Sequence, residues 1–493
     1  MKDIKQLEQL VAARMPIVAI ESHDEAKVLQ MFERYCALNE RTLWTWSVTS
    51  GLQKANSREN AYNTTKIEDA LRHIEKSPAN YIYLFLDAHR FIDDPVVLRQ
   101  IKDIAAKSET THRLLAFLSA KLEVPQEIER LTARFRPSLP DAARVVEIVN
   151  EEARRYREST GAQVKANREA LGVLTQHLGG LTEDDARRLA RMAIRDDGEI
   201  SAADIAAVLK AKHELVAASD VLLLETGVPD IEQLGGLAGL KRWLKVRRDV
   251  FMSPSADSPL PAPKGVLLLG VQGAGKSLAA KCVAGAWRLP LFRMDFGALY
   301  QKYHGETEKN IREALAVADA MAPCVLWMDE IEKGVAADAG GDSDGGVSRR
   351  VLGTLLTWMN ERTSRVFMVA TANDIAQLPP QLLRKGRVDE IFFVDLPAAP
   401  ARADILRIHL KRNKQDPASF DLPRLAATAE GFSGAEIEQA IVAALYEVHA
   451  QKKPLDDDAV EVELKRTRPL SVVMAEKVAA LRAWARERTV PAD

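Results

Sequence analysis

Short apolar runs alternate with longer amphipathic stretches along most of the chain. After Pro16, four runs of strand length (IVAI, TLWTWSV, YIYLFLD and RLLAFLS) are separated by segments with helical spacing. This alternation is typical of a parallel β-sheet covered by helices. It predicts an N-terminal α/β domain over residues 1–150.

The character of the sequence changes after this domain. Residues 151–225 are rich in alanine and in charged residues at helical spacing, and Thr182, with Asp185 three positions later, can cap a helix. We expect a small helical, lid-like segment and a connector here. A stretch rich in proline and serine, FMSPSADSPLPAPKG, then precedes a second set of strands.

The second set of apolar runs comprises VLLLG, PLFRMD, CVLWMD, VFMVAT and EIFFVDLP, with helical stretches between them. Together they predict a second α/β domain over residues 226–398. Beyond Pro397 the pattern is helical, which indicates a helical lid over residues 399–450 and further helices over residues 451–493. The expected fold class is therefore α/β, with two α/β domains in one chain.

The composition narrows the classes of partner. The chain of 493 residues has 68 basic and 70 acidic residues, so composition does not indicate the excess positive charge that favours nucleic acid. Its three cysteines lack metal-ligand spacing, which fits a reducing compartment. No secretory signal pattern is present, and the apolar runs are shorter than the roughly 20 residues of a membrane span. We expect a cytoplasmic protein, or a stromal one in a plastid, without a membrane partner.

The segment GVQGAGKS, residues 270–277, fits the phosphate-binding pattern GxxxxGK[ST] between a predicted strand and a predicted helix. Its glycines allow backbone amides to surround phosphate oxygens at the positive end of the helix. Lys276 supplies a cation to the β- and γ-phosphates, and Ser277 is a ligand for Mg²⁺. The pattern predicts ATP and Mg²⁺ as cofactors. The ATP contacts expected in this segment are Gly270, Gln272, Gly273, Ala274, Gly275, Lys276, Ser277 and Leu278.

Two further strand ends carry polar residues suited to hydrolysis. The strand CVLWMD leads to Asp329 and Glu330, and VFMVATAN ends at Asn373. We expect Asp329 to bind Mg²⁺, Glu330 to orient and deprotonate the attacking water, and Asn373 to position that water. An Asp-Glu pair alone is more often a solvated strand end, so this interpretation depends on the phosphate-binding loop.

Arg384 and Arg387 follow in the segment LLRKGRVDE. An arginine on an exposed loop is usually only solvated. One that enters the site of a neighbouring subunit can stabilise charge on the γ-phosphate, an effect worth about 10³ or more in rate in other nucleotide hydrolases. Both arginines are therefore candidate catalytic residues.

Taken in order, these motifs resemble those of the AAA ATPases over roughly residues 226–450. The resemblance rests on Gly235-Gly236-Leu237, the phosphate-binding loop, Asp329-Glu330, Asn373, Arg387, His409 and Gly434-Ala435. It implies that adenine and ribose are flanked by Gly235, Gly236, His409, Gly434 and Ala435. It also implies that Arg387 reaches the nucleotide of a neighbouring subunit in a homo-oligomeric ring, usually a hexamer. The sequence departs from the family pattern at Glu390, where many members have a second arginine.

Features outside this region resemble one group within the family, the ycf AAA proteins of plastids, cyanobacteria and other bacteria, named for the forty-sixth hypothetical chloroplast reading frame. These features include WxVTxGL near residue 46 and the terminal LRAWARER. The segment LYQKYHGETEKNIREAL resembles the pore loop of AAA unfoldases, which implies that Lys302, Tyr303 and His304 grip a polypeptide. A plain structural interpretation instead makes Tyr303 a partly buried helix residue. Residues 338–346 resemble a second pore loop or an ordinary surface loop.

The N-terminal domain is interpreted as a degenerate copy of the AAA-like fold without a phosphate-binding loop. Where that loop would follow Ile20, the sequence is ESHDEAK, which has no glycine and three acids and would repel a triphosphate. Asp87 lies at an acidic strand end, but Ala88 follows where a catalytic acid is needed. An unrelated flavodoxin-like or receiver-like domain is the alternative.

The leading functional hypothesis is an ATP-hydrolysing ring that remodels or translocates a protein client of unknown identity. The alternative is a slow nucleotide-dependent switch or scaffold that recruits a partner, which Glu390 mildly favours. A nucleic-acid motor is a third, weaker candidate because the charge of the chain is balanced.

Overall fold

The computed structural model describes residues 2–57, 59–166, 168–195, 198–216, 221–252, 260–300, 307–335, 345–384 and 386–493. The chain divides into two compact units. The first unit contains Met1–Leu171 and Leu178–Ile200, and the second contains Gly172–His177 and Ser201–Asp493. In the described parts of the chain, no helix is long and apolar enough to cross a membrane.

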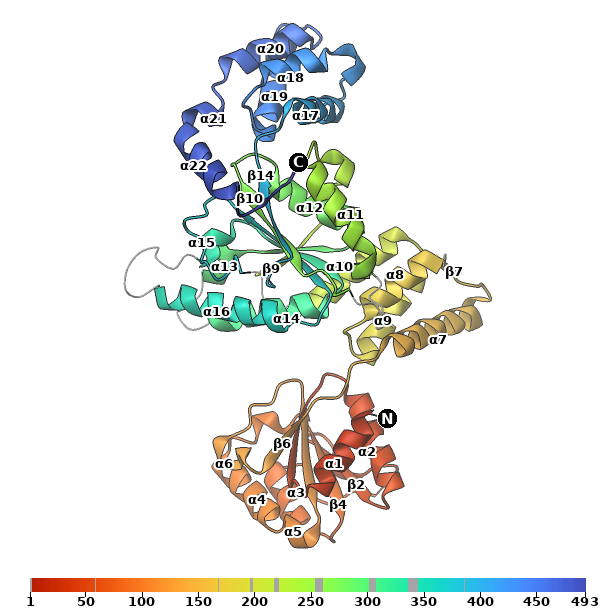
Figure 1. Ribbon diagram of the computed structural model, residues 1–493. Helices are drawn as coiled ribbons and strands as arrows, with labels where there is room; N and C mark the ends of the chain where they lie inside the picture. Colours follow the sequence, from red (N-terminus) through yellow and green to blue (C-terminus); the bar gives the residue numbers. More distant parts are fainter. Residues whose placement is uncertain are drawn as a thin grey trace. The chain divides into compact units, whose positions relative to one another are not determined.

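The first unit is built around a six-stranded sheet, which is red to orange in Figure 1. The strand order is β3-β2-β4-β5-β1-β6. Neighbouring strands run parallel except β2 and β3. The strands are β1 (Ile17–Glu21), β2 (Thr42–Ser47), β3 (Gly51–Lys54), β4 (Tyr81–Leu86), β5 (Leu114–Ser119) and β6 (Thr132–Phe135). The helices are α1 (Lys2–Ala12), α2 (Glu25–Leu38), α3 (Ile67–Lys76), η1 (Ala88–Arg90), α4 (Pro95–Ala106), α5 (Ser108–Thr111) and α6 (Gln126–Glu129).

Both faces of this sheet are buried. Val18 and Ile20 of β1 pack with Phe32 of α2 on one face, whereas Ile17 and Ala19 pack with residues of α3 and α4 on the other. Burial on both faces explains why the strands are nearly continuous apolar runs. The predicted α/β architecture of this domain is confirmed.

Helices follow the sheet in the first unit. These helices and their short strands are α7 (Ala142–Thr160), β7 (Lys165–Ala166), α9 (Glu183–Arg195) and β8 (Glu199–Ile200). Helix α8 (Arg168–Leu178) is divided between the two units. Helices α7 and α9 are joined by ion pairs from the buried Glu152 to Arg187 and Arg191. Helix α7 runs through residue 150, and the domain boundaries expected from the sequence stay predictions.

The second unit has a seven-stranded sheet with the order β15-β14-β10-β13-β12-β11-β9. Its strands are β9 (Leu222–Glu225), β10 (Gly265–Gly270), β11 (Leu291–Met294), β12 (Cys324–Met328), β13 (Val366–Ala372), β14 (Glu390–Val394) and β15 (Val490–Pro491). All neighbours are parallel except β9 and β11. The five central strands were predicted from the sequence, and the two edge strands were not.

Helices cover both faces of this sheet, and a separate helical group forms the lid (Figure 1). The helices around the sheet are α10 (Ala202–Val216), η2 (Ile231–Gln233), α11 (Ala238–Met252), α12 (Lys276–Trp287), α13 (Phe296–Tyr300), α14 (Thr307–Ala320), α15 (Ile331–Val335) and α16 (Gly345–Glu361). The lid and the helices after it are α17 (Ala399–Arg412), η3 (Pro417–Ser419), α18 (Leu422–Thr428), α19 (Gly434–Ala450), α20 (Asp457–Arg466), α21 (Leu470–Val473) and α22 (Ala475–Ala485). The lid has its own core, which includes Leu406, Leu425 and Ile441.

Candidate active site

The loop between β10 and α12 forms one wall of a cavity of about 380 Å³, a volume typical of small-ligand sites. Gly273 and Gly275 adopt positive φ angles of 74° and 96°, which glycine reaches without a steric penalty. A Cβ atom on Gly270 would lie 2.0 Å from the carbonyl oxygen of Val394 on the neighbouring strand. These glycines allow the backbone to turn tightly at the start of α12, where helix amides can bind an anion.

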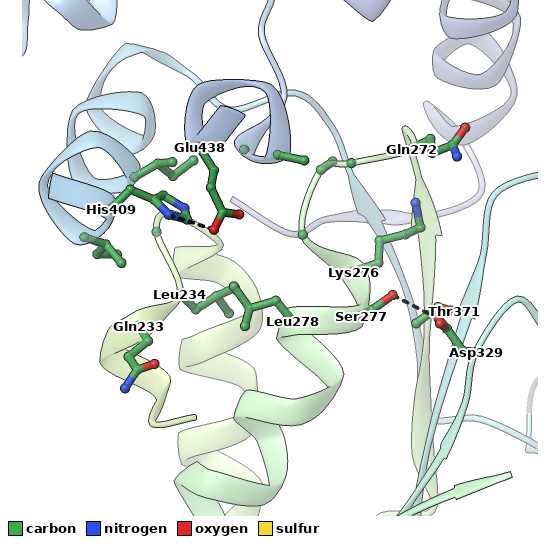
Figure 2. Close-up of a pocket in the computed structure, with 18 of the residues that line it drawn as sticks. Gln233, Leu234, Gln272, Lys276, Ser277, Leu278, Asp329, Thr371, His409 and Glu438 are labelled. Carbon is green, nitrogen blue, oxygen red and sulfur yellow. Dashed lines mark hydrogen bonds and ion pairs between the residues drawn. The ribbon is translucent and has the colours of Figure 1, made fainter. Parts of the chain in front are cut away.

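Lys276 begins α12 and lies beneath the loop. Its side chain is 5% exposed, and Nζ donates hydrogen bonds to the carbonyl oxygens of Gly270 (2.9 Å) and Val271 (2.8 Å). Burial lowers the pKa of Lys276 to about 8, although the carboxylates of Glu332, Asp329 and Glu330 oppose this shift. The amine is therefore a partly desolvated cation at the wall of the cavity (Figure 2).

Asp329 lies beside Ser277 at the end of β12. Its Oδ1 accepts hydrogen bonds from Ser277 Oγ (3.0 Å) and Thr371 Oγ1 (2.5 Å), and Figure 2 shows the three side chains together. A carboxylate and two hydroxyls are oxygen donors of the kind that Mg²⁺ prefers. The residues present therefore fit a Mg²⁺ ion.

Glu330 follows in a strained conformation, with φ of 48°. Its amide nitrogen donates to Thr371 Oγ1 (3.0 Å), and its Oε1 accepts from Asn373 Nδ2 (3.0 Å). Its Oε2 forms an ion pair with Lys333. Positive φ is uncommon for a residue other than glycine, and such strain is often found at functional sites. The structure thus brings Glu330 and Asn373 together at the edge of the cavity, as predicted.

Glu332 is a buried acid next to this pair that the sequence interpretation missed. It is 3% exposed, and its Oε1 accepts a hydrogen bond from the amide nitrogen of Asn373 (2.9 Å). Burial raises the pKa of its carboxyl group above the ordinary value, and the neighbouring Glu330 adds to this effect. Glu332 therefore fixes the backbone position of Asn373.

The lid closes the opposite side of the cavity. His409 on α17 lies with Nδ1 3.6 Å from Glu438 Oε1 on α19 (Figure 2), and burial lowers the pKa of this histidine. The amide of Ala435 donates to the carbonyl oxygen of Gly273 (3.2 Å), which joins the lid to the phosphate-binding loop. The cavity is lined by Gln233, Leu234, Gly235, Gln272, Gly273, Ala274, Gly275, Lys276, Ser277, Leu278, Asp329, Glu330, Thr371, Asn373, Ile405, Ile408, His409, Arg412, Gly434, Ala435 and Glu438.

The comparisons with known proteins agree with this geometry. A family model for AAA, the ATPase family associated with various cellular activities, matches residues 266–396. Models for the N-terminal and second domains of SpoVK-like AAA ATPases match residues 3–136 and 143–219. The AAA domain-containing protein ycf46 of Guillardia theta is 32% identical over 489 residues, which cover 98% of this chain and 95% of that protein. The chain belongs to the ycf46 group of AAA ATPases.

Two further relatives match only part of the chain. The cell division cycle protein 48 homologue of Archaeoglobus fulgidus is 35% identical over 222 residues, which cover 43% of this chain and 30% of that protein. The 26S proteasome regulatory subunit 8 homologue of Schizosaccharomyces pombe is 35% identical over 230 residues, 44% of this chain and 56% of that protein. As an AAA ATPase, the protein hydrolyses ATP, and the predicted enzyme class is confirmed.

The predicted residues of this AAA ATPase do not all line its own cavity. Gly236 and Gly270 lie just outside the lining, and Arg384 and Arg387 are not among the described residues that form it. Arg387 instead donates a hydrogen bond to the carbonyl oxygen of Gln381. Lys302, Tyr303 and His304, and most of the expected second pore loop, lie outside the described residues.

The sequence interpretation missed seven residues of the lining. These residues are Gln233, Leu234, Thr371, Ile405, Ile408, Arg412 and Glu438. Four positions on α17 line the cavity, and their helical spacing around His409 is a signal that could have indicated them. Thr371 was less visible because a threonine inside an apolar strand is ordinary.

Proposed function

We propose that this AAA ATPase binds ATP with Mg²⁺ in the described cavity and uses hydrolysis to remodel or translocate a protein client. The observation that carries the proposal is the grouping of Lys276, Asp329, Glu330 and Asn373 around one cavity. Lys276 binds the β- and γ-phosphates. Glu330 accepts a proton from the attacking water, and its strained backbone and the Asn373 amide fix its carboxylate.

Ser277 and Asp329 hold Mg²⁺ in this proposal. When bound, the ion neutralises charge on the phosphate oxygens. Thr371 donates to the same Asp329 oxygen as Ser277, so it orients the carboxylate. Gly235, His409, Gly434 and Ala435 bind the adenosine part of the nucleotide between the lid and the sheet domain.

Arg387 acts on the nucleotide of a neighbouring subunit, and the protein works as a homo-oligomeric ring, for which we propose a hexamer. This arrangement is supported by the position of Arg387 and Arg384 outside the lining of their own cavity. Glu390 stands where many relatives have a second arginine, so Arg387 carries this role with Arg384 in support. Arg387→Ala is expected to slow hydrolysis about 10³-fold, the lower end for such an arginine.

The name of one relative supports a protein as the client. The proteasome regulatory subunit homologue is, by its name, part of a machine that acts on proteins. The proposal places the grip on the client at Lys302, Tyr303 and His304. The balanced charge of the chain gives no comparable support to a nucleic-acid client.

A slow nucleotide-dependent switch that recruits a partner is the second candidate, because Glu390 places an acid at the position of the second arginine. Slow turnover that is unchanged by Tyr303→Ala, but altered by one specific partner protein, would favour the switch over the remodeller.

The decisive experiment is Glu330→Gln in the full chain. The amide cannot accept the proton of water, so turnover should fall about 10²-fold or more while ATP stays bound. Glu361→Gln, an exposed position at the end of α16, is the matched control and should retain normal turnover. Retained nucleotide, oligomer mass and co-purified proteins would be measured on the same samples. Normal hydrolysis by Glu330→Gln would refute the assignment.

A further inference from the structure

The segment Leu470–Asp493 runs from the lid to the wall of the nucleotide cavity. At its start, the amide of Leu470 donates to Glu436 Oε1 (2.7 Å). Glu436 also forms the capping box of α19 with Ser433. The start of α19 is the part of the lid that hydrogen-bonds the phosphate-binding loop at Gly273. The segment is therefore attached to the lid close to the cavity (Figure 1, dark blue).

The segment is attached a second time where the sheet domain joins the lid. Arg482 of α22 forms a two-pronged ion pair with Asp395, with nitrogen to oxygen distances of 2.8 to 3.0 Å. Asp395 comes directly after β14 and is followed by Leu396 and Pro397, which lead into α17. This geometry is that of a bidentate arginine and carboxylate pair, which fixes orientation better than a single contact does.

The segment then joins the sheet itself. Strand β15 pairs in parallel with β14, and the amide of Ala492 donates to the carbonyl oxygen of Phe393 (3.0 Å). The carbonyl oxygen of Ala492 accepts from the amide of Leu240 in α11 (2.9 Å), and the Ala492 side chain is buried in the sheet core. These bonds fix the position of the next residue, Asp493.

Asp493 Oδ1 accepts hydrogen bonds from the backbone amides of Leu237 and, at 3.4 Å, Ala238. Ala238 is the first residue of α11, so the carboxylate caps this helix and faces its positive end. Leu237 is 5% exposed and has φ of 55°, a conformation that is a genuine outlier for a bulky residue. Asp493 thus stabilises the strained turn at Leu237 by accepting a hydrogen bond from the amide of that residue.

This turn is also the wall of the nucleotide cavity. Leu234 and Gly235 line the cavity directly. A Cβ atom on Gly235 would lie 2.5 Å from Ile405 Cγ1, and one on Gly236 would lie 2.8 Å from Ala401 Cβ and 3.1 Å from Asp493 Oδ1. The turn is therefore fixed between Asp493 on one side and lid helix α17 on the other. A shift of the turn would change both the cavity wall and the fit of the lid.

We propose that Asp493 is a positioning residue for nucleotide binding. By capping α11 and holding the turn at Leu237, it keeps Leu234 and Gly235 in place against the bound nucleotide. The proposal rests on the proposed function, because it requires that ATP binds in this cavity. It extends that function to Asp493, which is 256 positions from Leu237 in the sequence and is not among the residues that line the cavity.

The test compares Asp493→Ala with Asp493→Asn in the full chain. Asp493→Ala removes the acceptor from two amides, so the dissociation constant of a fluorescent ADP analogue should rise about tenfold. KM for ATP should rise by the same factor, while kcat at saturation stays within about twofold, because the catalytic residues lie elsewhere. Asparagine keeps an oxygen acceptor and is as good a helix cap as aspartate, so Asp493→Asn should restore most of the affinity. Glu487→Ala, an exposed residue of the same segment, is the control with unchanged binding.

The outcomes separate the two proposals. If the wild-type protein does not bind the analogue, the proposed function fails, and this inference fails with it. If the wild type binds and Asp493→Ala binds equally well, only the inference is overturned. Thermal unfolding of each variant shows whether the chain is folded. A folded Asp493→Ala variant that loses kcat without a change in KM would also contradict a positioning role in binding.

Discussion

The two sheets of this AAA ATPase share the order of five parallel strands but differ in chemistry. If the five parallel strands that the two sheets share are numbered along the chain, β6-β1-β5-β4-β2 and β14-β10-β13-β12-β11 both have the order 5-1-4-3-2. The first sheet adds β3 at one edge, and the second adds β9 and β15. The shared order supports the interpretation of the N-terminal domain as a degenerate copy. It also shows that the fold alone does not make a nucleotide site.

The difference is concentrated where the first strand meets its helix. In the ATPase sheet, residues 271–275 connect β10 to α12, and the cap residue Gly275 leaves the helix amides open to a ligand. In the N-terminal sheet, residues 22–24 connect β1 to α2, and Asp24 Oδ1 accepts the amide of Lys27 (3.0 Å). A buried carboxylate of the chain therefore already accepts an amide at the start of α2, the end of a helix at which phosphates bind.

The end of the third parallel strand shows a similar contrast. Asp87 directly follows β4, as Asp329 follows β12, although the positive φ falls on Asp87 itself (53°) in the first sheet and on the next residue, Glu330 (48°), in the second. However, Ala88 stands in place of a catalytic acid. The hydroxyl of Ser119 at the end of β5 donates to the carbonyl oxygen of Lys121 (2.9 Å), whereas Thr371 at the end of β13 donates to Asp329. The strand ends of the first sheet therefore lack the groups that are proposed to bind a metal and activate water in the second.

Paired substitutions of Lys276 and Lys27 should show the largest difference between the sheets. Removing one partner of a buried charged pair costs about 3–5 kcal/mol, so Lys276→Ala should weaken ATP binding roughly a thousandfold. Lys27 lies near the start of the corresponding helix, but its Nζ donates to the carbonyl oxygen of Ser138 (2.6 Å). Lys27→Ala should therefore leave ATP binding unchanged. Equilibrium binding of labelled ATP measures both, and a loss of binding in Lys27→Ala would contradict the assignment of a single nucleotide site.

A second contrast concerns Glu332. This residue lies three positions after Asp329, and the residue three positions after Asp87 in the N-terminal sheet is Arg90. Glu332→Ala leaves the amide of Asn373 unpaired, a penalty of about 1–3 kcal/mol. If this penalty displaces Asn373 from Glu330, kcat should fall about tenfold with little change in ATP affinity. Glu332→Gln retains an oxygen acceptor and serves as the matched control. Equal kcat values for the two variants would show that the hydrogen bond to Asn373 does not position the site.

The two sheets also show what a sequence can predict. The apolar runs indicated the five parallel strands of the ATPase sheet, and the GxxxxGK[ST] pattern located Lys276 and Ser277 because their spacing is fixed by local backbone geometry. Edge strand β15 was not predictable, since its two residues gain their structure only by pairing with β14. The roles of Glu332 and Asp493 also depend on contacts between distant segments. Asp24, by contrast, was visible as one of the acids that replace the glycine-rich loop.

Binding should also depend on pH through Lys276 in the ATPase sheet. Its pKa is lowered to about 8 by burial, and its charged form is the one proposed to bind phosphate. The affinity for ATP should therefore be highest below pH 8 and should fall about tenfold between pH 7 and pH 9, as the amine loses its proton. Phosphate groups with a last pKa of about 6 are largely ionised above pH 7, so they contribute little to this profile.

Lys276→Arg is the control for this profile. Arginine stays charged above pH 12, so the affinity of this variant, whatever its absolute value, should be constant from pH 7 to pH 9. The measurement is a series of binding curves in buffers of equal ionic strength, because charge interactions are screened by salt. A wild-type profile as flat as that of Lys276→Arg would mean that another group controls binding.

The smallest expected effect is that of substituting Asp24. This residue caps α2 in the first sheet, whereas Gly275 is the cap residue of α12 in the second. Asp24→Ala removes the cap of α2 and should destabilise the chain by about 1 kcal/mol. Asp24→Asn keeps the cap. Burial raises the pKa of Asp24, and the charges of Asp184 and Glu183 act in the same direction, so the ionised carboxylate is held in an unfavourable position. The neutral amide should therefore be tolerated within about 0.5 kcal/mol, the usual range of benign substitutions.

Denaturant unfolding followed by the tryptophans of β2 would measure this difference, because Trp44 and Trp46 lie in the core of the first unit. Neither variant should bind ATP at the first sheet, since the loop is still short and still has no glycine.

The raised pKa of Asp24 also fixes the sign of the pH dependence. A raised folded-state pKa means that the acid favours stability in its protonated form, so the advantage of Asp24→Asn over the wild type should grow as pH rises through the pKa of Asp24. An advantage that shrinks over this interval would mean that the Asp24 charge stabilises the domain, and the N-terminal loop would then have kept its carboxylate for the charge rather than for the cap.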